Sequence, residues 1–320
     1  MPETTRKVSI IGAGNVGMRY AYALMIDSTA RQIVMVDIDR DRLEGEVMDL
    51  SHGAPYIRPV EVRAGDYPDI GGSDLVVITA GAGQKPGQSR LDLVRANVDL
   101  YRKIIPEVEK HAPDAIFLIV TNPVDALSFA AHKISSKPSR EIVGSGTVLD
   151  TARFRYLLAA HCMVDPRNVH AYILGEHGDS EVAVWSRVMI GGLLLNDYCP
   201  ICDRFNTCRH EEELEEVFTE VRDSAYEIID RKGETSYGIG LALVRITRAI
   251  INDENSILPV SSLMTGYLGM EDVYLSIPAI VNRRGVEKVL GIKLAGKEEE
   301  ALKHSAYVLT SVIEEAGLRG

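Results

Sequence analysis

The stretch VSIIGAGNVG, residues 8–17, decides the fold of this chain. A run of apolar and β-branched residues stops at its first glycine, and a second apolar stretch, residues 16–26, has the composition of a helix. Between the two, GAGNVG matches the pattern G-x-G-x-x-G. Glycines at this spacing let the backbone approach a pyrophosphate, which the helix N-terminus then binds. The pattern assigns these residues to a dinucleotide site: Gly12, Gly14, Asn15, Val16 and Gly17.

The second predicted strand, residues 32–37, ends in Asp37, about 20 residues after the last glycine of the motif. A carboxylate at this position accepts hydrogen bonds from ribose hydroxyls and repels the 2′-phosphate of NADP. Ile38 offers that phosphate no compensating charge, while the nearby Arg40 leaves the exclusion of NADP open. NAD is therefore the favoured cofactor, and Asp37 is assigned to its site.

The alternation of strands and helices continues outward through the first half of the chain. Further strands are predicted at residues 75–78, 116–120 and 142–144, and the clearest helix at residues 91–111. The strand segments are apolar throughout, which is typical of parallel strands covered on both faces. We therefore expect an α/β fold with a doubly wound parallel sheet, the Rossmann arrangement.

The second half of the chain has a different organisation. Helical spacing of apolar residues predicts amphipathic helices at residues 211–232 and 297–316, and strands are expected to be sparser. The apolar face of the first helix comprises Leu214, Val217, Phe218, Val221, Ala225, Ile228 and Ile229. No Pro-, Gly- or Ser-rich linker separates the halves, so we expect two closely packed domains with a cleft between them. We place an NAD-binding domain at residues 1–147 and an α+β substrate domain at residues 148–320.

The composition describes an acidic chain of 320 residues. Lys and Arg number 35 against 46 Asp and Glu, which gives a formal net charge of −11. This balance argues against nucleic-acid and membrane partners, which normally require a basic face. The chain shows no signal-peptide core and no apolar run near the ~20 residues that cross a bilayer. With four cysteines in the whole chain, a reducing cytoplasm is the expected location.

Three further segments carry residues suited to proton transfer and anion binding. His177 follows an apolar strand and lies between small residues, which leaves its ring reachable. Asp150 and Arg153 are three positions apart near the start of a predicted helix and so share one face. Residues 81–90 form a Gly- and Pro-bearing loop after a strand, where open α/β sheets bind ligands. Each of these features also has a purely structural alternative. For His177 it is a hydrogen-bonded or exposed histidine, and for Asp150 it is an acid that stabilises the helix dipole beside a solvated Arg153. For residues 81–90 it is a surface connection.

Taken together, these motifs resemble the lactate/malate dehydrogenases. The segments GAGNVG, GAGQKPGQSR, TNP, LDTARFR and GEHGDS occur in that family's order, with Asp37 after the first. The resemblance implies an NAD-dependent oxidoreductase that transfers a hydride between a 2-hydroxy acid and a 2-oxo acid. A protein that kept this fold only for binding or for a structural role is the alternative from another class. Such a protein would not need an acid–base pair beside a substrate clamp.

The resemblance also implies a role for each catalytic residue. His177 would be the acid and base, suited by an ordinary pKa of about 6.5, and Asp150 would orient its ring. Arg153 would bind the substrate carboxylate through two hydrogen bonds. Arg90 would polarise the reacting oxygen, to which Asn122 would also donate a hydrogen bond.

Other positions would line the cleft. By the same resemblance, Thr235 would face the substrate and Ile239 the nicotinamide. Gly81 and Asn122 would contact the cofactor. Both residues follow predicted strands, where the carboxyl edge of the sheet is expected.

The position that separates malate from lactate enzymes in this family lies six residues before Arg90 and holds Gln84. Malate enzymes resemble one another in having arginine there, paired with the second carboxylate of oxaloacetate. A neutral amide gives that carboxylate no ion-pair partner, so pyruvate and L-lactate are favoured. Lys85 beside it keeps malate and bulkier 2-oxo acids open as alternatives.

A second anion site is implied by Arg155 and His170, which match the pair that binds fructose 1,6-bisphosphate between subunits of many bacterial lactate dehydrogenases. On a helix, Arg155 lies about 200° from Arg153 and so points away from the substrate. If the chain from residue 170 to residue 177 is extended, His170 lies on the strand face opposite His177. Two surface cations are the structural alternative. The resemblance also implies a homotetramer.

The cysteines offer a zinc-like pattern, C-x-x-C followed by C-x-H, at Cys199, Cys202, Cys208 and His210. The family chemistry leaves no role for a metal. We therefore interpret these cysteines as free thiols and assign no metal ligands.

Overall fold

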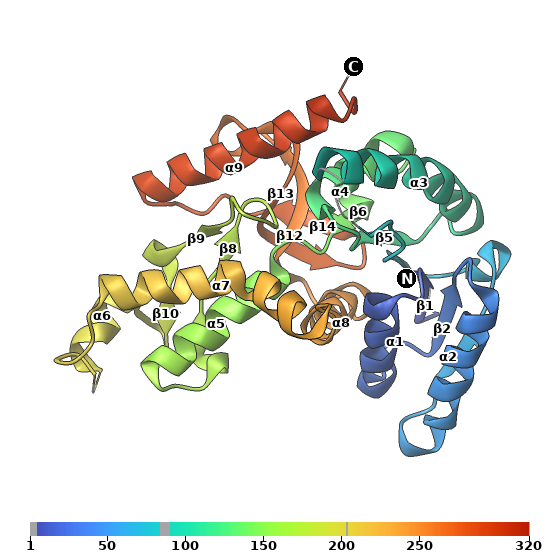
Figure 1. The fold of residues 1–320 in the computed structure, drawn as a ribbon, viewed down its shortest axis with the longest axis horizontal. Coiled ribbons are helices and arrows are strands. Elements are labelled where there is room, and N and C mark those ends of the chain that lie inside the picture. The colour runs from blue at the N-terminus through green and yellow to red at the C-terminus, as the bar shows by residue number, and fades with distance from the viewer. Residues whose placement is uncertain (1–4, 84–89, 203, 320) are drawn as a thin grey trace.

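The computed structural model describes residues 5–83, 90–202 and 204–319, with Arg90 described by its backbone alone. A sheet of nine strands in the order β14-β13-β12-β6-β5-β4-β1-β2-β3 runs through the molecule (Figure 1). Its parallel part comprises β1 (Lys7–Ile11), β2 (Gln32–Val36), β3 (Glu61–Ala64), β4 (Leu75–Ile78), β5 (Ile116–Ile119) and β6 (Ile142–Gly144). Its antiparallel part comprises β12 (Ser256–Thr265), β13 (Glu271–Asn282) and β14 (Gly285–Val289).

The parallel part confirms the doubly wound α/β arrangement. Its strands send alternate side chains into two different cores, Val77 into one and Ile78 into the other. Both faces are covered, which explains why these strands are apolar throughout. The strand order reverses between β1 and β4, and ligands of such sheets bind at the carboxyl ends of the strands beside this point.

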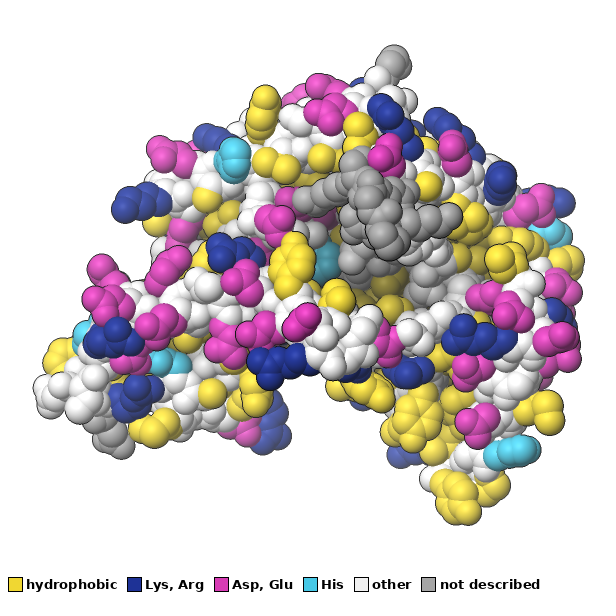
Figure 2. Space-filling view, in the orientation of Figure 1, with side chains coloured by type: hydrophobic (Ala, Val, Ile, Leu, Met, Phe, Trp, Pro, Cys, Tyr) yellow, Lys and Arg dark blue, Asp and Glu magenta, His cyan; other side chains and the backbone are white. Residues whose placement is uncertain are grey.

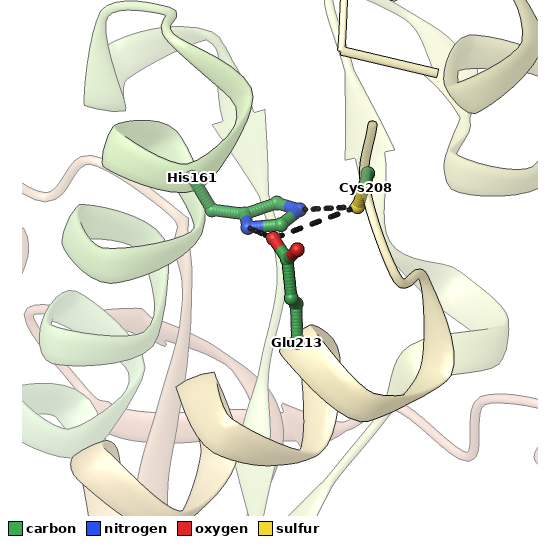
Figure 3. A group of neighbouring side chains, drawn as sticks. All are labelled: His161, Cys208 and Glu213. Atoms are coloured by element: carbon green, nitrogen blue, oxygen red, sulfur yellow. Dashed lines mark hydrogen bonds and ion pairs between the residues drawn. The ribbon is translucent and has the colours of Figure 1, made fainter. Parts of the chain in front are cut away.

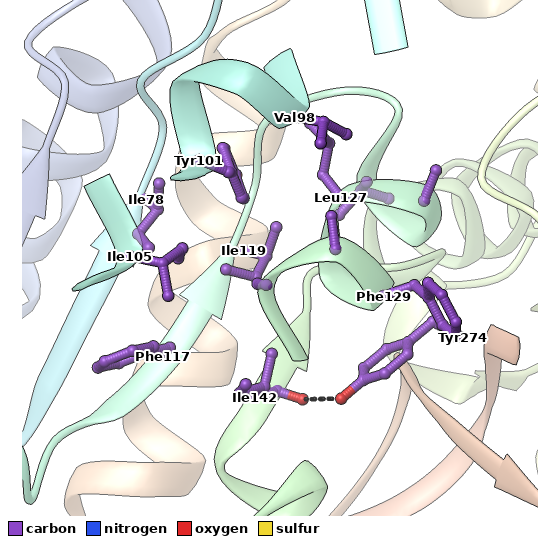
Figure 4. Packing of buried hydrophobic residues seen from close by; sticks show 14 of the residues in the cluster. Ile78, Val98, Tyr101, Ile105, Phe117, Ile119, Leu127, Phe129, Ile142 and Tyr274 are labelled. Atoms are coloured by element: carbon purple, nitrogen blue, oxygen red, sulfur yellow. Dashed lines mark hydrogen bonds between the residues drawn. The ribbon is translucent and has the colours of Figure 1, made fainter. Parts of the chain in front are cut away.

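Helices cover both faces of the sheet (Figure 1). One face carries α3 (Arg90–His111), α4 (Val124–Ile134) and α9 (Gly296–Glu315). Figure 4 shows the core on this side, where Tyr101, Phe129 and Tyr274 are buried. The other face carries α1 (Asn15–Asp27), α2 (Arg40–His52) and α8 (Tyr237–Ile251). Because α8 and α9 come from the second half of the chain, both halves contribute to both cores.

The expectation of sparser strands in the second half is wrong. That half contains the antiparallel strands of the large sheet, and β12 joins them to the parallel part through the pair Ser261 and Gly144. Pro259 and Pro278, which face each other across β12 and β13, interrupt the sequence pattern that identifies strands. The two halves are therefore united by one continuous sheet.

Short elements complete the second half. They are β7 (Val169–His170), β8 (Ile173–Leu174), β9 (Val182–Ala183), β10 (Met189–Ile190), β11 (Leu193–Leu194) and α6 (Leu195–Tyr198). A third core lies between them and the helices α5 (Val148–Cys162) and α7 (Glu211–Lys232). In Figure 1, α7 lies alongside α5 on the side of the molecule away from α1 and α2.

The helix α7 has the predicted bounds, but its predicted apolar face is only partly buried. Val217 and Val221 enter the third core, whereas Ile228 and Ile229 are 36% and 48% exposed. The prediction of one continuous buried face is therefore wrong for the C-terminal half of the helix. That half borders the cavity described below, to which Ile229 contributes.

Within the described ranges, no helix combines the length and apolarity that a membrane crossing requires. On the face shown in Figure 2, acidic and basic side chains are interspersed.

Candidate active site

The centre of the candidate site is an ion-paired triad built on α5 and on the segment that follows β8. The Nδ1 atom of His177 lies 2.5 Å from Oδ2 of Asp150. Arg153 donates through Nη1 to the other oxygen of the same carboxylate at 2.8 Å. The predicted shared helix face of Asp150 and Arg153 is thus confirmed, and it is directed at the histidine.

A second buried acid holds the backbone of the histidine. Asp125, in the first turn of α4, accepts a hydrogen bond from the His177 amide at 2.8 Å and another from the Ser261 hydroxyl at 2.5 Å. Burial raises the pKa of Asp125 to about 6. The strands and helices of both chain halves therefore position one ring, since α4 belongs to the first half and Ser261 lies on β12.

The electrostatics of the site favour a protonated imidazole. Burial is the largest single effect and lowers the pKa of His177, but the charge and hydrogen bond of Asp150, with Asp125 and Glu181, outweigh it. Together these carboxylates raise the pKa of His177 to about 9. Burial opposes the charge of Asp150 too, yet His177 and Arg153 hold the pKa of that carboxyl below its usual range. A carboxylate can only accept, so Nδ1 carries a hydrogen and Nε2 is left to meet a substrate.

A cavity of about 380 Å³ opens beside this triad. The His177 side chain is 24% exposed, so its ring is reachable from the cavity although mostly withdrawn from water. The cavity is lined by Asn122 and Pro123 from one side, by the triad and Glu181, and by Arg222, Ala225, Tyr226 and Ile229 of α7. Its volume suits a small organic acid. It combines a proton donor with a guanidinium group, two of the groups that reduction of a 2-oxo acid requires besides a hydride donor.

Sequence reasoning missed Glu181 and the α7 residues of this cavity. Glu181 is 9% exposed, and its Oε1 atom has no hydrogen-bond partner within the described residues. Burial, then the nearby Asp150 charge, raises the pKa of Glu181. Its position four residues after His177 was the available signal. Nothing local connected α7 with the site, because that helix is distant in sequence.

A larger cavity, about 980 Å³, lies at the carboxyl ends of β1, β2 and β4. Gly12, Gly14, Asp37 and Gly81 line it, so four of the predicted cofactor residues meet there. A Cβ atom on Gly12, whose φ is +109°, would lie 2.5 Å from the backbone nitrogen of Ala80. A Cβ atom on Gly17 would lie 2.0 Å from the carbonyl oxygen of Gly12.

By contrast, nothing lies within 4 Å of the corresponding position on Gly14. The turn is therefore tight where the protein packs on itself and open where a pyrophosphate would approach. These residues fit a dinucleotide, with Asn15 and Val16 in the first turn of α1 providing its N-terminus.

Asp37 directly follows β2 and braces the glycine turn. Its Oδ2 atom accepts a hydrogen bond from the Ala13 amide at 2.6 Å, and Oδ1 accepts one from the Asp39 amide at 3.0 Å. Arg40 is bound to Glu44, to Asp66 and to the carbonyl oxygen of Gly65. Because the charge of Arg40 is already paired, it compensates a 2′-phosphate poorly, and the fit favours NAD.

Asn97 lies between the residues that line the two cavities, and sequence reasoning missed it as well. This fully buried side chain accepts a hydrogen bond from the Ala82 amide at 2.7 Å and donates to the Asn122 carbonyl at 3.2 Å. Next to it, a Cβ atom on Gly81 would lie 2.2 Å from the Thr121 methyl group. Gly81 and Asn122 are thus held together at the base of the 81–90 loop.

The remaining predicted residues lie in different positions. Thr235 follows α7 and Ile239 lies in the first turn of α8; neither is among the described residues that line the cavity beside His177. Gln84 and Lys85 lie outside the described residues, as does the side chain of Arg90.

The predicted second anion site is described in full. Arg155 donates through Nε to the Ala171 carbonyl at 3.0 Å, and its guanidinium lies over the Tyr172 ring. His170, adjacent to Ala171, is exposed. The condition for placing His170 on the strand face opposite His177, one extended segment joining them, is not met. The strands β7 and β8 belong to separate sheets, so no single strand joins the two histidines.

Family models match both parts of the chain. Residues 6–144 match the NAD binding domain of lactate/malate dehydrogenase, and residues 147–317 match its alpha/beta C-terminal domain. The chain belongs to the lactate/malate dehydrogenase family. The glycine turn and Asp37 thus lie in the family's NAD-binding domain, and His177 and its partners Asp150 and Arg153 lie in its C-terminal domain.

Known members of this family resemble the chain over nearly its full length. The L-lactate dehydrogenase of Thermoanaerobacter sp. (strain X514) is 50% identical over 309 residues, which cover 97% of this chain and 98% of the relative. That of Synechococcus sp. (strain JA-3-3Ab) is 50% identical over 308 residues, 96% of this chain and 98% of the relative.

Solved structures of lactate dehydrogenases have the same fold. One from a Medee basin deep-sea metagenome library has a TM-score of 0.95 and 43% identity, and the match covers 99% of this chain and 100% of the other. The minor L-lactate dehydrogenase of Enterococcus mundtii, in a ligands-bound form, has a TM-score of 0.93 and 41% identity, with 98% of each chain covered. The family and fold expected from the order of the motifs are confirmed.

Proposed function

We propose that this chain is an NAD-dependent L-lactate dehydrogenase that interconverts pyruvate and L-lactate. The observation that carries the proposal is the triad of His177, Asp150 and Arg153 at one cavity, which places a proton donor beside a carboxylate-binding guanidinium. Relatives that are 50% identical and named L-lactate dehydrogenase support it.

The residues of the triad divide the work of the reaction. When bound, the cofactor would supply the hydride as NADH or accept it as NAD⁺. His177, protonated near neutral pH, gives its Nε2 proton to the carbonyl oxygen of pyruvate and recovers it from the hydroxyl of lactate. Asp150 holds Nδ1 and stabilises the imidazolium. The guanidinium nitrogens of Arg153 that are not bonded to Asp150 hold the substrate carboxylate.

Other residues complete the site in this proposal. Arg90 and Asn122 polarise the reacting oxygen from the loop and from the turn before α4. Thr235 and Ile239 line the substrate and nicotinamide sides of the cleft. Gly81 contacts the cofactor, in agreement with its place in the larger cavity.

Pyruvate is proposed over oxaloacetate because Gln84 lacks the charge that a second carboxylate requires. A dicarboxylate in a closed site would leave one carboxylate without a cation, which is costly in an environment that excludes water. Malate dehydrogenase and activity on bulkier 2-oxo acids are the second candidates, and Lys85 is the residue that favours the former.

We further propose that fructose 1,6-bisphosphate binds at Arg155 and His170 in a homotetramer. Arg155 donates a hydrogen bond to the carbonyl of Ala171, the neighbour of His170. Because neither Arg155 nor His170 lines the cavity beside His177, an anion bound to them would not compete with the substrate. We keep the division into domains of residues 1–147 and 148–320, and the cytoplasm as the location, as parts of the proposal.

The deciding experiment compares NADH oxidation with pyruvate, oxaloacetate and a branched 2-oxo acid, each with and without fructose 1,6-bisphosphate. We expect the highest kcat/KM with pyruvate and a lower KM when the bisphosphate is present. Preference for oxaloacetate would support the malate alternative, and identical kinetics and assembly with the bisphosphate would refute the second site.

The variant His177→Asn should keep its affinity for NADH, measured by fluorescence, and lose most turnover. The matched control is His304→Asn, which changes an exposed histidine of α9 and should leave turnover unchanged. Full turnover of His177→Asn would exclude the proposed proton donor.

A further inference from the structure

The four cysteines of the chain meet at one small cavity far from the triad. Cys162 ends α5, Cys199 and Cys202 follow α6, and Cys208 precedes α7. All four line a cavity of about 20 Å³, together with His161 and His210. A site of this size has room for one water molecule or one ion. The chain has only four cysteines, and all of them lie around this one space.

Three side chains at this place, His161, Cys208 and Glu213, are of the types that bind metal ions and contact one another (Figure 3). The Cys208 Sγ atom lies 3.5 Å from Nε2 of His161 and 3.7 Å from Oε2 of Glu213. Nδ1 of His161 lies 3.4 Å from the same Glu213 oxygen. One ligand atom from each of these residues lies within 4.8 Å of the others. The two His161 contacts involve opposite ring nitrogens, and a single ion binds only one of these. Zinc–ligand bonds of about 2.0 to 2.3 Å in a tetrahedron give edges of about 3.3 to 3.7 Å, so ligand atoms within 4.8 Å of one another reach this geometry after small shifts of their side chains.

We propose that His161, Cys208 and Glu213 bind a zinc ion, with a thiolate of the same cavity as the fourth ligand. Cys162, Cys199 and Cys202 line the same cavity and are the candidates for this fourth ligand. The metal ion displaces the proton of each coordinating thiol, which passes to solvent. All four cysteines are free of disulfides, as the sequence predicts, and the proposal makes Cys208 and one other of them metal ligands.

The charges around the cavity are consistent with a metal ion that has this ligand set. Arg204 donates to Oε2 of Glu213 at 2.9 Å, so it would oppose a cation bound by Glu213 and a single thiolate. With two thiolates and Glu213, the ligands carry three negative charges against the two positive charges of zinc. Arg204 then balances the remaining negative charge, which accounts for a second cysteine among the ligands.

The site would act as a structural clamp. His161 lies at the C-terminal end of α5, which carries Asp150 and Arg153 near its start. Glu213 lies in the first turn of α7, which contributes Arg222 and Tyr226 to the cavity beside His177. A shared metal ion would therefore fix the ends of two helices whose other parts build the active site. Its primary effect is on stability, not on the chemical step.

The test is metal analysis of the full-length protein, purified without chelators and with its thiols kept reduced. We expect one zinc per chain by elemental analysis, and a higher Tm with zinc than after chelation. Replacement by Co²⁺ should produce the thiolate-to-cobalt charge-transfer absorption of a tetrahedral site. Cys208→Ser and His161→Asn should each weaken zinc affinity, measured by competition with a chromophoric chelator, by about 100-fold or more, because even an outer-shell partner contributes 10- to 100-fold.

Matched controls separate binding from folding. Glu213→Gln should weaken binding, whereas Glu215→Gln, an exposed position on the same helix, should leave it unchanged. Circular dichroism verifies the fold of each variant. The proposal is overturned if the reduced protein takes up neither zinc nor Co²⁺, or if folded Cys208→Ser and His161→Asn bind zinc as tightly as the unaltered chain.

Discussion

His177 and Asp150 are joined by a 2.5 Å contact between Nδ1 and a carboxylate oxygen, and the second oxygen of that carboxylate is held by Arg153. The proposed proton donor and the proposed substrate clamp are therefore attached to the same acid. A change in Asp150 consequently acts on both the acidity of the ring and the position of the guanidinium.

The first prediction concerns pH. In the proposed mechanism pyruvate reduction requires protonated His177, so its rate should fall as the pH rises through about 9, while lactate oxidation should rise over the same range. In Asp150→Asn the carboxylate that raises the pKa is lost, and both transitions should move to lower pH. We expect turnover to fall by about 10²- to 10⁴-fold. Steady-state pH profiles in both directions measure this, with the surface variant Asp114→Asn as control; unmoved transitions in Asp150→Asn would contradict the assignment.

The second prediction concerns the clamp. Arg153→Lys keeps the charge but removes the planar pair of donors, so it should lower kcat/KM for pyruvate by about 10- to 100-fold, equivalent to a charged hydrogen bond of 1.5–3 kcal/mol. The affinity for NADH should be unchanged. Arg231→Lys, at the exposed end of α7, is the control. Equal kinetics in the two variants would show that Arg153 does not bind the carboxylate.

The third prediction concerns substrate choice. Gln84→Arg should raise kcat/KM for oxaloacetate relative to pyruvate by about tenfold or more, since one new ion pair of 1.4 kcal/mol corresponds to that factor. Gln84→Glu introduces the opposite charge and should reduce oxaloacetate turnover further. Specificity constants for both acids decide the matter, and an unchanged ratio in Gln84→Arg would remove this residue from the specificity argument.

The fourth prediction concerns the cofactor. Asp37→Ser removes the carboxylate that repels a 2′-phosphate, while the Ala13 amide loses its 2.6 Å partner. We expect the ratio of kcat/KM for NADPH to that for NADH to rise by about tenfold or more. Asp41→Ser, on the exposed surface of α2, should leave the ratio unchanged. If NADPH is used equally by both variants, Asp37 does not select the cofactor.

The fifth prediction concerns Asn97. Asn97→Ala leaves the Ala82 amide and the Asn122 carbonyl without this buried partner. The free energy of unfolding should fall by about 1–3 kcal/mol, and KM for NADH should rise because the loop base is released. Chemical denaturation and steady-state kinetics measure the two effects. The exposed Asn196→Ala serves as control, and a variant of Asn97 with unaltered stability and KM would contradict this role.

Much of the fold could be predicted because its signals are local. The bounds of β4, β6 and α7 follow from contiguous residues, and the glycine turn with Asp37 depends on a strand, a turn and a helix that are consecutive. The strands β12 and β13 could not be recognised, since Pro259 and Pro278 interrupt their pattern and their burial depends on neighbouring strands. Local propensity identifies an element only where its environment is also local.

The residues of the site likewise comprise some that the sequence predicts and others that only the fold brings together. The residue types His177, Asp150 and Arg153, their spacing and the order of the motifs were enough to predict the family and the chemistry. Folding was needed to bring Glu181 and α7 to the triad, Asn97 between the two cavities, and His161 and Glu213 to Cys208. These residues lie on separate elements, and chain connectivity alone does not specify which of them meet. Packing of the sheet and helices determines those contacts, and with them the acidity of His177.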